Sequence, residues 1–307
     1  MRSYLNPFIE AIGMSKKVEE FYEKHYKKLM IIPILILIFS LGVLINNYYT
    51  KGEFIGRDVE LKGGVDVTID KPGIDILKVE SLLLGNYEDY TVRELTDFST
   101  HQNLGVNIKI GDLKEDDVKD LKLLLQDELE FNDEQFSPSI TQAEFSSGFY
   151  QGLLLVVLFS FIMMAISVSI AFRTFIPSVA VISAAFLDII FPLALLSLFG
   201  VKITGAGIVA FLLIIGYSID TDVLLTTWMI KRKDGSYLER MVKSIKTGVT
   251  MTMTTIIVMI IGIVLSISPV LHQMFLIILI ALITDLISTY LWNAPILIGY
   301  CKRKGIN

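Results

Sequence analysis

Four aspartates stand out in this sequence because they fall inside long apolar stretches: Asp188, Asp220, Asp222 and Asp285. A carboxylate in the hydrocarbon of a bilayer costs several kcal/mol, from about 2.5 upward, unless it has a partner, a proton or water. The same stretches contain no Lys, Arg or His. Any positive partner would therefore be a proton, a bound cation or a residue of another chain. These residue types predict a group that takes up and releases a proton or another cation.

The apolar stretches that hold the aspartates are long enough to cross a bilayer, which takes about 20 apolar residues. There are six of them, at residues 29–48, 149–172, 175–199, 203–230, 249–269 and 273–299. The charged fraction is 19%, below the roughly 25% of soluble chains. We predict an α-helical polytopic membrane protein with six transmembrane helices. A soluble enzyme, a disordered protein and a fibrous protein are excluded.

The distribution of Lys and Arg predicts the orientation of the chain. These residues gather in segments 1–28, 231–247 and 300–307, which the positive-inside rule places in the cytoplasm with both termini. We expect a multi-pass protein of the cell membrane. Segment 1–28 fits either an amphipathic helix on the membrane surface or a solvated extension of the first span. In segment 231–247, Ser236 and Glu239 form a capping-box pattern that predicts a short separate helix.

The depth of the acids follows from the helical rise of about 1.5 Å per residue. Counted from the cytoplasmic ends, Asp188, Asp220 and Asp285 lie at about 20, 15 and 21 Å, close to one layer. Asp220 and Asp222 are about 200° apart around a helix, so we expect one to face inward and the other a partner subunit. The alternative for each acid is a neutral or hydrogen-bonded side chain that only holds helices together. We expect Asp220 to be the leading coupling residue.

Three neighbouring residues are predicted to shape these helices. Gly216 permits close helix packing. Loosening of the helix at Gly216-Tyr217-Ser218 is the one condition under which Asp220 and Asp222 would not face opposite sides. Pro192 is expected to kink the third span just after Asp188. A kink there is consistent with a hinge and equally with a static shape.

Residues 50–147 are predicted to form a separate domain outside the cell. They hold 22 Asp and Glu against 10 Lys and Arg, whereas the rest of the chain is positive. Alternating apolar residues predict strands over 59–70, 90–98, 106–110 and 139–145, with helices over 74–84 and 118–129. The first strand contains Lys62, Gly63 and Gly64. The order βαββαβ is the ferredoxin-like arrangement.

Catalytic and metal-binding patterns are missing from the sequence. A single Cys301 excludes an internal disulfide, and His25, His101 and His272 leave no Cys/His metal site. We find no nucleophile constellation and no phosphate-binding loop. We therefore expect no enzyme activity, no metal and no cofactor. The acidic domain would repel nucleic acid or merely keep itself soluble, so we expect no nucleic-acid partner.

Three features together resemble the archaeal SecF members of the SecD/SecF family. They are the plan of one span, an outer domain and five spans, the strand Glu60-Leu61-Lys62-Gly63-Gly64-Val65, and the run Gly216-Tyr217-Ser218-Ile219-Asp220-Thr221-Asp222-Val223-Leu224-Leu225. The resemblance covers residues 29–300. It implies the resistance-nodulation-division membrane fold and pairing with a SecD-like subunit. It also implies service to the Sec translocon channel, using the proton gradient to help unfolded secretory polypeptides across the membrane.

The resemblance assigns the acids unevenly. Asp220 matches the carboxylate of the SecD-type motif, whereas the carboxylate of bacterial SecF would align with Thr221. Bacterial members place an Arg where this chain has Trp228. The chain therefore departs from the bacterial pattern, and the acids at 220 and 222 are the ones through which this subunit would couple to a cation.

Two other functions stay open. One is a half-subunit of an exporter for a small molecule or lipid with the same membrane fold, and the other is a structural clamp of the translocon without coupling. Such exporters carry twelve spans and two large outer loops, whereas this chain has six spans and one such segment. The chain has half the spans of such an exporter, which favours an obligate partner subunit. Membrane lipid would surround either assembly.

Overall fold

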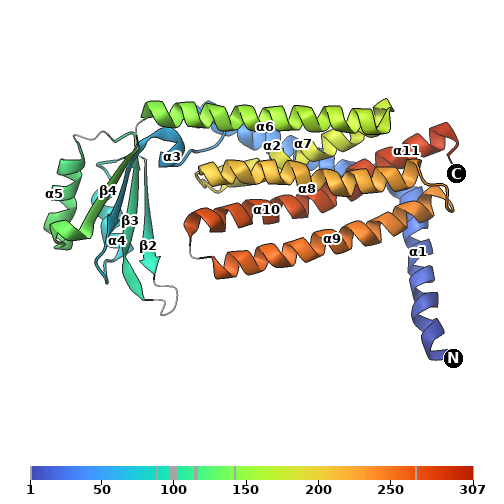
Figure 1. The fold of residues 1–307 in the computed structure, drawn as a ribbon, viewed down its shortest axis with the longest axis horizontal. Coiled ribbons are helices and arrows are strands. Elements are labelled where there is room, and N and C mark those ends of the chain that lie inside the picture. The colour runs from blue at the N-terminus through green and yellow to red at the C-terminus, as the bar shows by residue number, and fades with distance from the viewer. Residues whose placement is uncertain are drawn as a thin grey trace. The chain divides into compact units, whose positions relative to one another are not determined.

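The computed structural model describes residues 2–87, 89–96, 102–113, 117–141, 143–266 and 268–306, with side chains described from Lys16 onward except at 143–145. The chain forms two compact units. The helical unit comprises Met1–Ile55, Val156–Val201 and Ala206–Asn307, and the sheet unit comprises Gly56–Leu155 and Lys202–Gly205. Figure 1 shows the long helices of the first and the strands of the second.

The helical unit is built from helices, most of which are long and apolar. They are α1 (Arg2–Leu29), α2 (Ile31–Lys51), α6 (Ala143–Phe172), α7 (Phe175–Leu198), α8 (Gly205–Ile230), α9 (Tyr237–Leu265), α10 (Pro269–Ser288) and α11 (Ala294–Lys304). Within the described residues, six helical segments are long and apolar enough to cross a membrane: Lys16–Lys51, Ser146–Phe172, Phe175–Leu198, Gly205–Ile230, Tyr237–Leu265 and Pro269–Lys304. The predicted fold class, a polytopic α-helical membrane protein, is confirmed.

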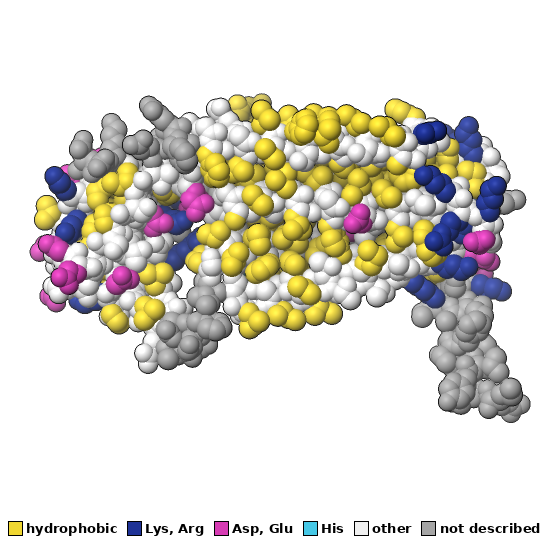
Figure 2. All heavy atoms as spheres, in the orientation of Figure 1, with side chains coloured by type: hydrophobic (Ala, Val, Ile, Leu, Met, Phe, Trp, Pro, Cys, Tyr) yellow, Lys and Arg dark blue, Asp and Glu magenta, His cyan; other side chains and the backbone are white. Residues whose placement is uncertain are grey.

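The outward faces of these helices are apolar. Leu35 and Ile38 of α2, Phe159 of α6 and Ile257 of α9 are 57 to 62% exposed. Figure 2 shows such side chains spread over the long helices rather than gathered in one patch. Exposure of so much apolar surface to water would be unfavourable, whereas its contact with lipid tails is favourable.

Two helices differ from the sequence-based expectation. The predicted short helix over 231–247 is wrong as a separate element, because α9 continues from Tyr237 to Leu265 without a break. No proline interrupts that stretch, so the backbone hydrogen bonds continue. The predicted cap is present, since Ser236 Oγ accepts a hydrogen bond from the backbone N of Glu239 at 3.1 Å. The second difference is at the last span, where a π-helical segment η3 (Thr289–Asn293) joins α10 to α11.

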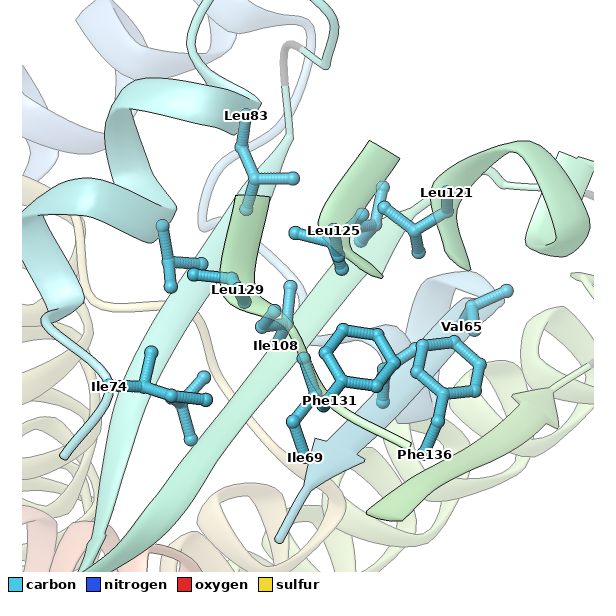
Figure 3. Close-up of a cluster of buried hydrophobic side chains, with 14 of the residues drawn as sticks. Val65, Ile69, Ile74, Leu83, Ile108, Leu121, Leu125, Leu129, Phe131 and Phe136 are labelled. Atoms are coloured by element: carbon cyan, nitrogen blue, oxygen red, sulfur yellow. The ribbon is translucent and has the colours of Figure 1, made fainter. Parts of the chain in front are cut away.

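The sheet unit has the ferredoxin-like topology. Its strands β1 (Gly64–Ile69), β2 (Tyr90–Thr96), β3 (Asn103–Gly111) and β4 (Phe136–Thr141) form one sheet in the order β2-β3-β1-β4, with every neighbouring pair antiparallel. Helices α4 (Ile76–Leu83) and α5 (Val118–Leu129) provide the apolar side chains that pack on the strands. Figure 3 shows Leu83, Leu121, Leu125 and Leu129 gathered with Val65, Ile69 and Ile108 of the strands.

The start of the first predicted strand is wrong. Residues Val59–Lys62 form a short helix α3, and β1 begins only at Gly64. Gly63 and Gly64 have φ values of 91° and 140°, which favour glycine. A Cβ on Gly64 would lie 2.2 Å from the carbonyl O of Ile110 on β3. The glycine pair therefore turns the chain and lets it approach β3 closely, and strand pairing starts after that turn.

The closing strand is also displaced from its predicted position of 139–145. β4 covers Phe136–Thr141 and pairs with the whole of β1, from Gly64 opposite Thr141 to Ile69 opposite Phe136. The six residues of β1 thus fix the length of β4, and helix α6 has begun by Ala143. Pro138 is tolerated in β4 because that strand lies at the edge of the sheet.

Candidate functional site

Asp188 on α7 is fully buried and both of its carboxyl oxygens are hydrogen-bonded. Ser218 Oγ donates to Oδ2 at 2.6 Å, and Ser288 Oγ donates to Oδ1 at 2.7 Å. These bonds join α7 to α8 and α10. Pro192, one turn later, has no N–H for the carbonyl of Asp188, so the helix loses one backbone hydrogen bond here.

Asp222 on α8 is also fully buried, but its two carboxyl oxygens differ in their hydrogen bonding. Thr289 Oγ1 donates to Oδ1 at 2.9 Å, and Asn293 Nδ2 donates to the same oxygen at 2.8 Å. Oδ2 accepts no hydrogen bond from the described residues. An ionised carboxylate with one such oxygen is strongly unfavourable in a dry interior. A proton or a cation on that oxygen would remove the penalty.

Asp285 on α10 lies next to both other acids. Thr221 Oγ1 lies 3.0 Å from each carboxyl oxygen of Asp285, and Thr289 Oγ1 lies 3.4 Å from Oδ1. The hydroxyl of Thr289 therefore bridges Asp222 and Asp285. Each hydroxyl has a single proton to donate, so it cannot satisfy both acids at once. We call Asp188, Asp222 and Asp285 the carboxyl cluster.

The π-helical segment η3 supplies two of the donors to this cluster. Single π-helical turns in α-helices are rare and occur frequently at functional sites. Here Thr289 begins the segment and Asn293 ends it, and both side chains reach Asp222. Sequence reasoning missed Ser288, Thr289 and Asn293. The available signal was the recurrence of polar residues at 285, 289 and 293 on an otherwise apolar span, a spacing that places them on one helix face.

A small cavity reaches the cluster between α8 and α10. It has a volume of about 10 Å³ and is lined by Asp285 and Ser218 with the apolar residues Leu213, Ile214, Tyr217, Ile278, Ala281 and Leu282. That volume is near the smallest that holds one water molecule. A proton reaching Asp285 would need no more room than this.

The structure brings together three of the four predicted acids. Asp220 lies outside the cluster on an exposed face of α8, whereas Asp222 faces inward. The expected layer of Asp188, Asp220 and Asp285 is therefore not the one that forms inside this chain. Gly216 shares the exposed face of Asp220, and a Cβ there would meet nothing within 4 Å. Helix α8 is continuous through 216–218, so Asp220 and Asp222 face opposite sides, and Ser218 binds Asp188.

The glycine motif of the sheet unit lies in a network of charges. Lys62 Nζ is 3.0 Å from Asp89 and 3.4 Å from Asp112. Asp89 also binds Lys202, which belongs to the same unit although it lies 113 residues further along the chain. Burial opposes ionisation of Asp89, but the hydrogen bonds and charges of Lys202 and Lys62 outweigh it and lower the pKa of the carboxyl below its usual 3.8.

Electrostatics limits what the carboxyl cluster can do. Three acids linked through shared hydroxyls cannot all be ionised in a buried site, because like charges there repel strongly. The sequence offers no Lys, Arg or His within the predicted spans to balance them. The arrangement is thus suited to holding and exchanging a proton among carboxyl groups, with hydroxyls and one amide that can reorient.

Comparison with known proteins gives consistent matches. The model of the family described as protein export membrane protein SecD/SecF, C-terminal, matches residues 124–303. The chain is 33% identical to the protein-export membrane protein SecF of Methanocaldococcus jannaschii, covering 90% of this chain and 96% of the relative. It is 30% identical to the SecF protein of Pyrococcus furiosus, covering 95% and 97%.

A solved structure shares the fold. The crystal structure of SecDF from Thermus thermophilus, a translocon-associated membrane protein, matches with a TM-score of 0.70 at 18% identity. The match covers 92% of this chain but only 38% of that longer chain. With the membrane helices, the ferredoxin-like unit and the sequence matches in agreement, the chain belongs to the SecF proteins of the SecD/SecF family of protein-export membrane proteins.

Proposed function

We propose that this chain is an accessory subunit of the Sec translocon that pairs with a SecD subunit and uses the proton gradient to promote protein export. Family membership supports the translocon role. Pairing is supported by the 38% coverage of the SecDF chain, since the remainder of that chain has no counterpart here. A second subunit would supply the counterpart.

The orientation that we propose has both termini in the cytoplasm. Residues of the three Lys- and Arg-rich segments lie at one end of the helical unit. Lys302 near the C-terminus is 3.7 Å from Glu23 and lies over the ring of Tyr26, so the two terminal segments are in contact. A common location of these segments is what the positive-inside rule requires.

The proton-coupling role rests mainly on Asp222 Oδ2. It is buried, belongs to a potentially charged group and accepts no hydrogen bond from the described residues. In this proposal Asp222 holds the exchanging proton, Asp285 shares it through Thr289, and Asp188 positions the helices. Protonation of Asp222 would change which groups donate to it, and the amide of Asn293 can turn its oxygen toward a protonated carboxyl.

Asp220 has a different place in the proposal. Its exposure on α8, one turn after Gly216, puts a carboxylate on a face that this chain leaves uncovered. A carboxylate facing lipid costs about 2.5–3.5 kcal/mol. We propose that this face of α8, with Val209 and Leu213 on the same side, meets the SecD subunit.

The structural clamp is the second candidate, and Asp188 favours it. Both oxygens of Asp188 are satisfied by serines from two other helices, as expected of a side chain that only holds helices together. A structural clamp alone does not account for Asp222. Its Oδ2 is buried without a hydrogen bond from the described residues, which is unfavourable and joins no helices. The two candidates therefore make opposite predictions for a variant that keeps shape but loses the titrating group.

The test is export in a strain that lacks its own copy of the protein and expresses the Asp222→Asn variant. Asn keeps the size and the hydrogen-bonding capacity but cannot exchange a proton at neutral pH. Pulse-labelled secretion of a reporter should fall to the level of the strain without the protein, while membrane insertion and copurification of SecD stay unchanged.

The matched control for Asp222→Asn is Thr226→Val, one turn further on the same helix. Thr226 is fully buried and its hydroxyl has no partner among the described residues, so its loss should leave export near the wild-type level. Wild-type export by Asp222→Asn would exclude proton coupling through this residue and leave the clamp. Loss of export by both variants would indicate general damage to α8.

A further inference from the structure

A second hollow in the helical unit shares no lining residue with the carboxyl cluster. It is a groove between the end of α1, the start of α7 and α11, with a volume of about 450 Å³. Its lining is Tyr26, Lys27, Met30, Ile176, Pro295, Ile296, Gly299, Tyr300, Lys302 and Arg303, which we call the basic groove. The volume lies within the roughly 300–1,000 Å³ of small-molecule sites.

The groove has a charged rim and an apolar floor. Lys27, Lys302 and Arg303 are exposed and carry three positive charges. Glu23 lies 3.7 Å from Lys302, and this one acid beside three cations leaves the rim with a net positive charge. Pro295 is buried, and Met30, Ile176 and Ile296 complete an apolar surface beneath the cations. A ligand that fits both must combine a negative group with a hydrocarbon part.

Contacts between α1 and α11 hold the rim in place. The ring of Tyr26 lies 6.0 Å from Lys27 Nζ and 5.2 Å from Lys302 Nζ, within the range of cation–π attraction. Gly299 of α11 lies beside this ring, since a Cβ there would be in van der Waals contact with Tyr26 Cε2 at 3.8 Å. Two cations from opposite ends of the sequence are thus gathered around one aromatic ring. Such gathering of like charges is favourable when an anion binds between them.

The position of the groove favours a ligand that comes from the membrane. It opens where a predicted membrane helix begins, at the end of the helical unit where Lys and Arg gather (Figure 2). Ile176 is 39% exposed, and its neighbour Phe175 is 84% exposed. Large apolar side chains exposed beside cations are typical of the boundary between lipid tails and headgroups.

We propose that the basic groove binds the phosphate headgroup of an anionic glycerophospholipid. Lys302 and Arg303 of α11 and Lys27 of α1 hold the phosphate, and the upper part of one acyl chain lies on Met30, Ile176 and Ile296. Basic pockets between membrane helices bind lipid headgroups in this way. Bound lipid would tie α1 and α11 together.

The test measures lipid retention by the full-length purified protein. Delipidated protein in detergent receives phosphatidylglycerol, phosphatidylcholine or inorganic phosphate, and bound molecules are counted by native mass spectrometry. We expect one phosphatidylglycerol per chain, no comparable retention of phosphatidylcholine, and no displacement by a 100-fold excess of inorganic phosphate. Each cation near an anionic lipid contributes about fivefold in binding constant. The double variant Lys302→Gln, Arg303→Gln should therefore bind about thirty-fold more weakly.

The control removes the same charge elsewhere. Lys243 and Lys246 are exposed on α9 and are not part of the lining, so Lys243→Gln, Lys246→Gln should bind phosphatidylglycerol like the wild type. An unchanged thermal unfolding temperature of both double variants checks their folding. The proposal fails if phosphatidylcholine is retained equally or if the groove variant binds like the control. Displacement of lipid by inorganic phosphate would show a simple anion site and equally refute the lipid assignment.

Discussion

Asp188 and Asp222 are both fully buried, yet their carboxyl groups have different surroundings. Ser218 and Ser288 satisfy both oxygens of Asp188, whereas Oδ1 of Asp222 takes two donors and Oδ2 takes none. The types of these residues were clear from the sequence. The division of roles between them depends on which hydroxyl reaches which oxygen, and that is decided by helix packing.

The hydroxyl of Thr289 is the residue-scale feature that can be tested most directly. Thr289→Val keeps the shape of the side chain and removes the hydroxyl that contacts both Asp222 and Asp285, while Asn293 and Thr221 remain as donors to the two acids. Loss of a hydrogen bond to a buried carboxyl group costs about 1–3 kcal/mol. We expect the free energy of unfolding of the detergent-solubilised protein to fall by that amount, measured by denaturant titration.

Thr289→Ser is the matched control, because it keeps the hydroxyl and removes one methyl group. Its effect should be about 1 kcal/mol or less, through packing alone. Equal destabilisation by the two variants would show that the hydroxyl makes no special contribution. In that case the link between the two acids has no energetic basis.

At the scale of elements, α8 and α9 are joined by a buried arginine. Arg240 of α9 is only 1% exposed, and it donates to the carbonyl of Met229 at 3.1 Å and to that of Gly235 at 3.1 Å. The carbonyl groups at the end of a helix lack partners within the helix, and a cation there also favours the helix dipole. Arg240 therefore holds the end of α8 and the turn after it.

Replacement of this arginine should destabilise the helical unit. Arg240→Ala removes both of these hydrogen bonds and leaves a space where a buried side chain lies, so we expect a loss of about 2–4 kcal/mol. The measurement is thermal unfolding in detergent, followed by far-ultraviolet circular dichroism. Lys243→Ala, an exposed change on the same helix, should cost less than about 0.5 kcal/mol. Similar losses from both variants would contradict the capping role.

At the scale of the whole molecule, a short stretch between two membrane helices belongs to the sheet unit. Residues Lys202–Gly205 follow α7 and end at the first residue of α8. Ile203 forms a parallel bridge with Arg57, and Lys202 binds Asp89. The sheet unit therefore includes a segment that comes after all four of its strands in the sequence, and this segment binds Arg57 and Asp89.

The Asp89 interaction predicts a dependence on pH. Because the pKa of Asp89 is lowered in the folded protein, its stabilising effect is present above the unfolded pKa of about 3.8 and is lost as the pH falls below that value. Asp89→Asn should expose β2 and β3 at pH 7, with about fivefold faster hydrogen exchange of their amides, since ion pairs of this kind contribute up to about 1 kcal/mol. The difference between the wild type and the variant should shrink as the pH is lowered from 7 toward 2.5.

Asp70→Asn serves as the control for this experiment, because Asp70 is exposed at the end of β1 and no ion pair involves it among the described contacts. Its exchange should match the wild type at both pH values. A difference between Asp89→Asn and wild type that is as large at pH 2.5 as at pH 7 would show that the effect comes from packing rather than from charge.

The sequence alone determined the membrane fold class and the ferredoxin-like arrangement. Both depend on patterns that are local and strong: runs of about 20 apolar residues must be helical in lipid, and period-2 alternation buries one face of a strand. The buried residues Val65, Val67 and Ile69 follow that alternation in β1. Family membership was also carried by residues that lie close together in the sequence, at 60–65 and 216–225.

Tertiary structure alone decided which acid faces inward and what binds it. A spacing of two residues separates Asp220 from Asp222 by about 200°, but it does not say which side of α8 packs against α7 and α10. The donors come from 67 and 71 residues further along the chain, at Thr289 and Asn293. The π-helical segment Thr289–Asn293 brings both donors to Asp222, and the apolar pattern of the last span does not predict it.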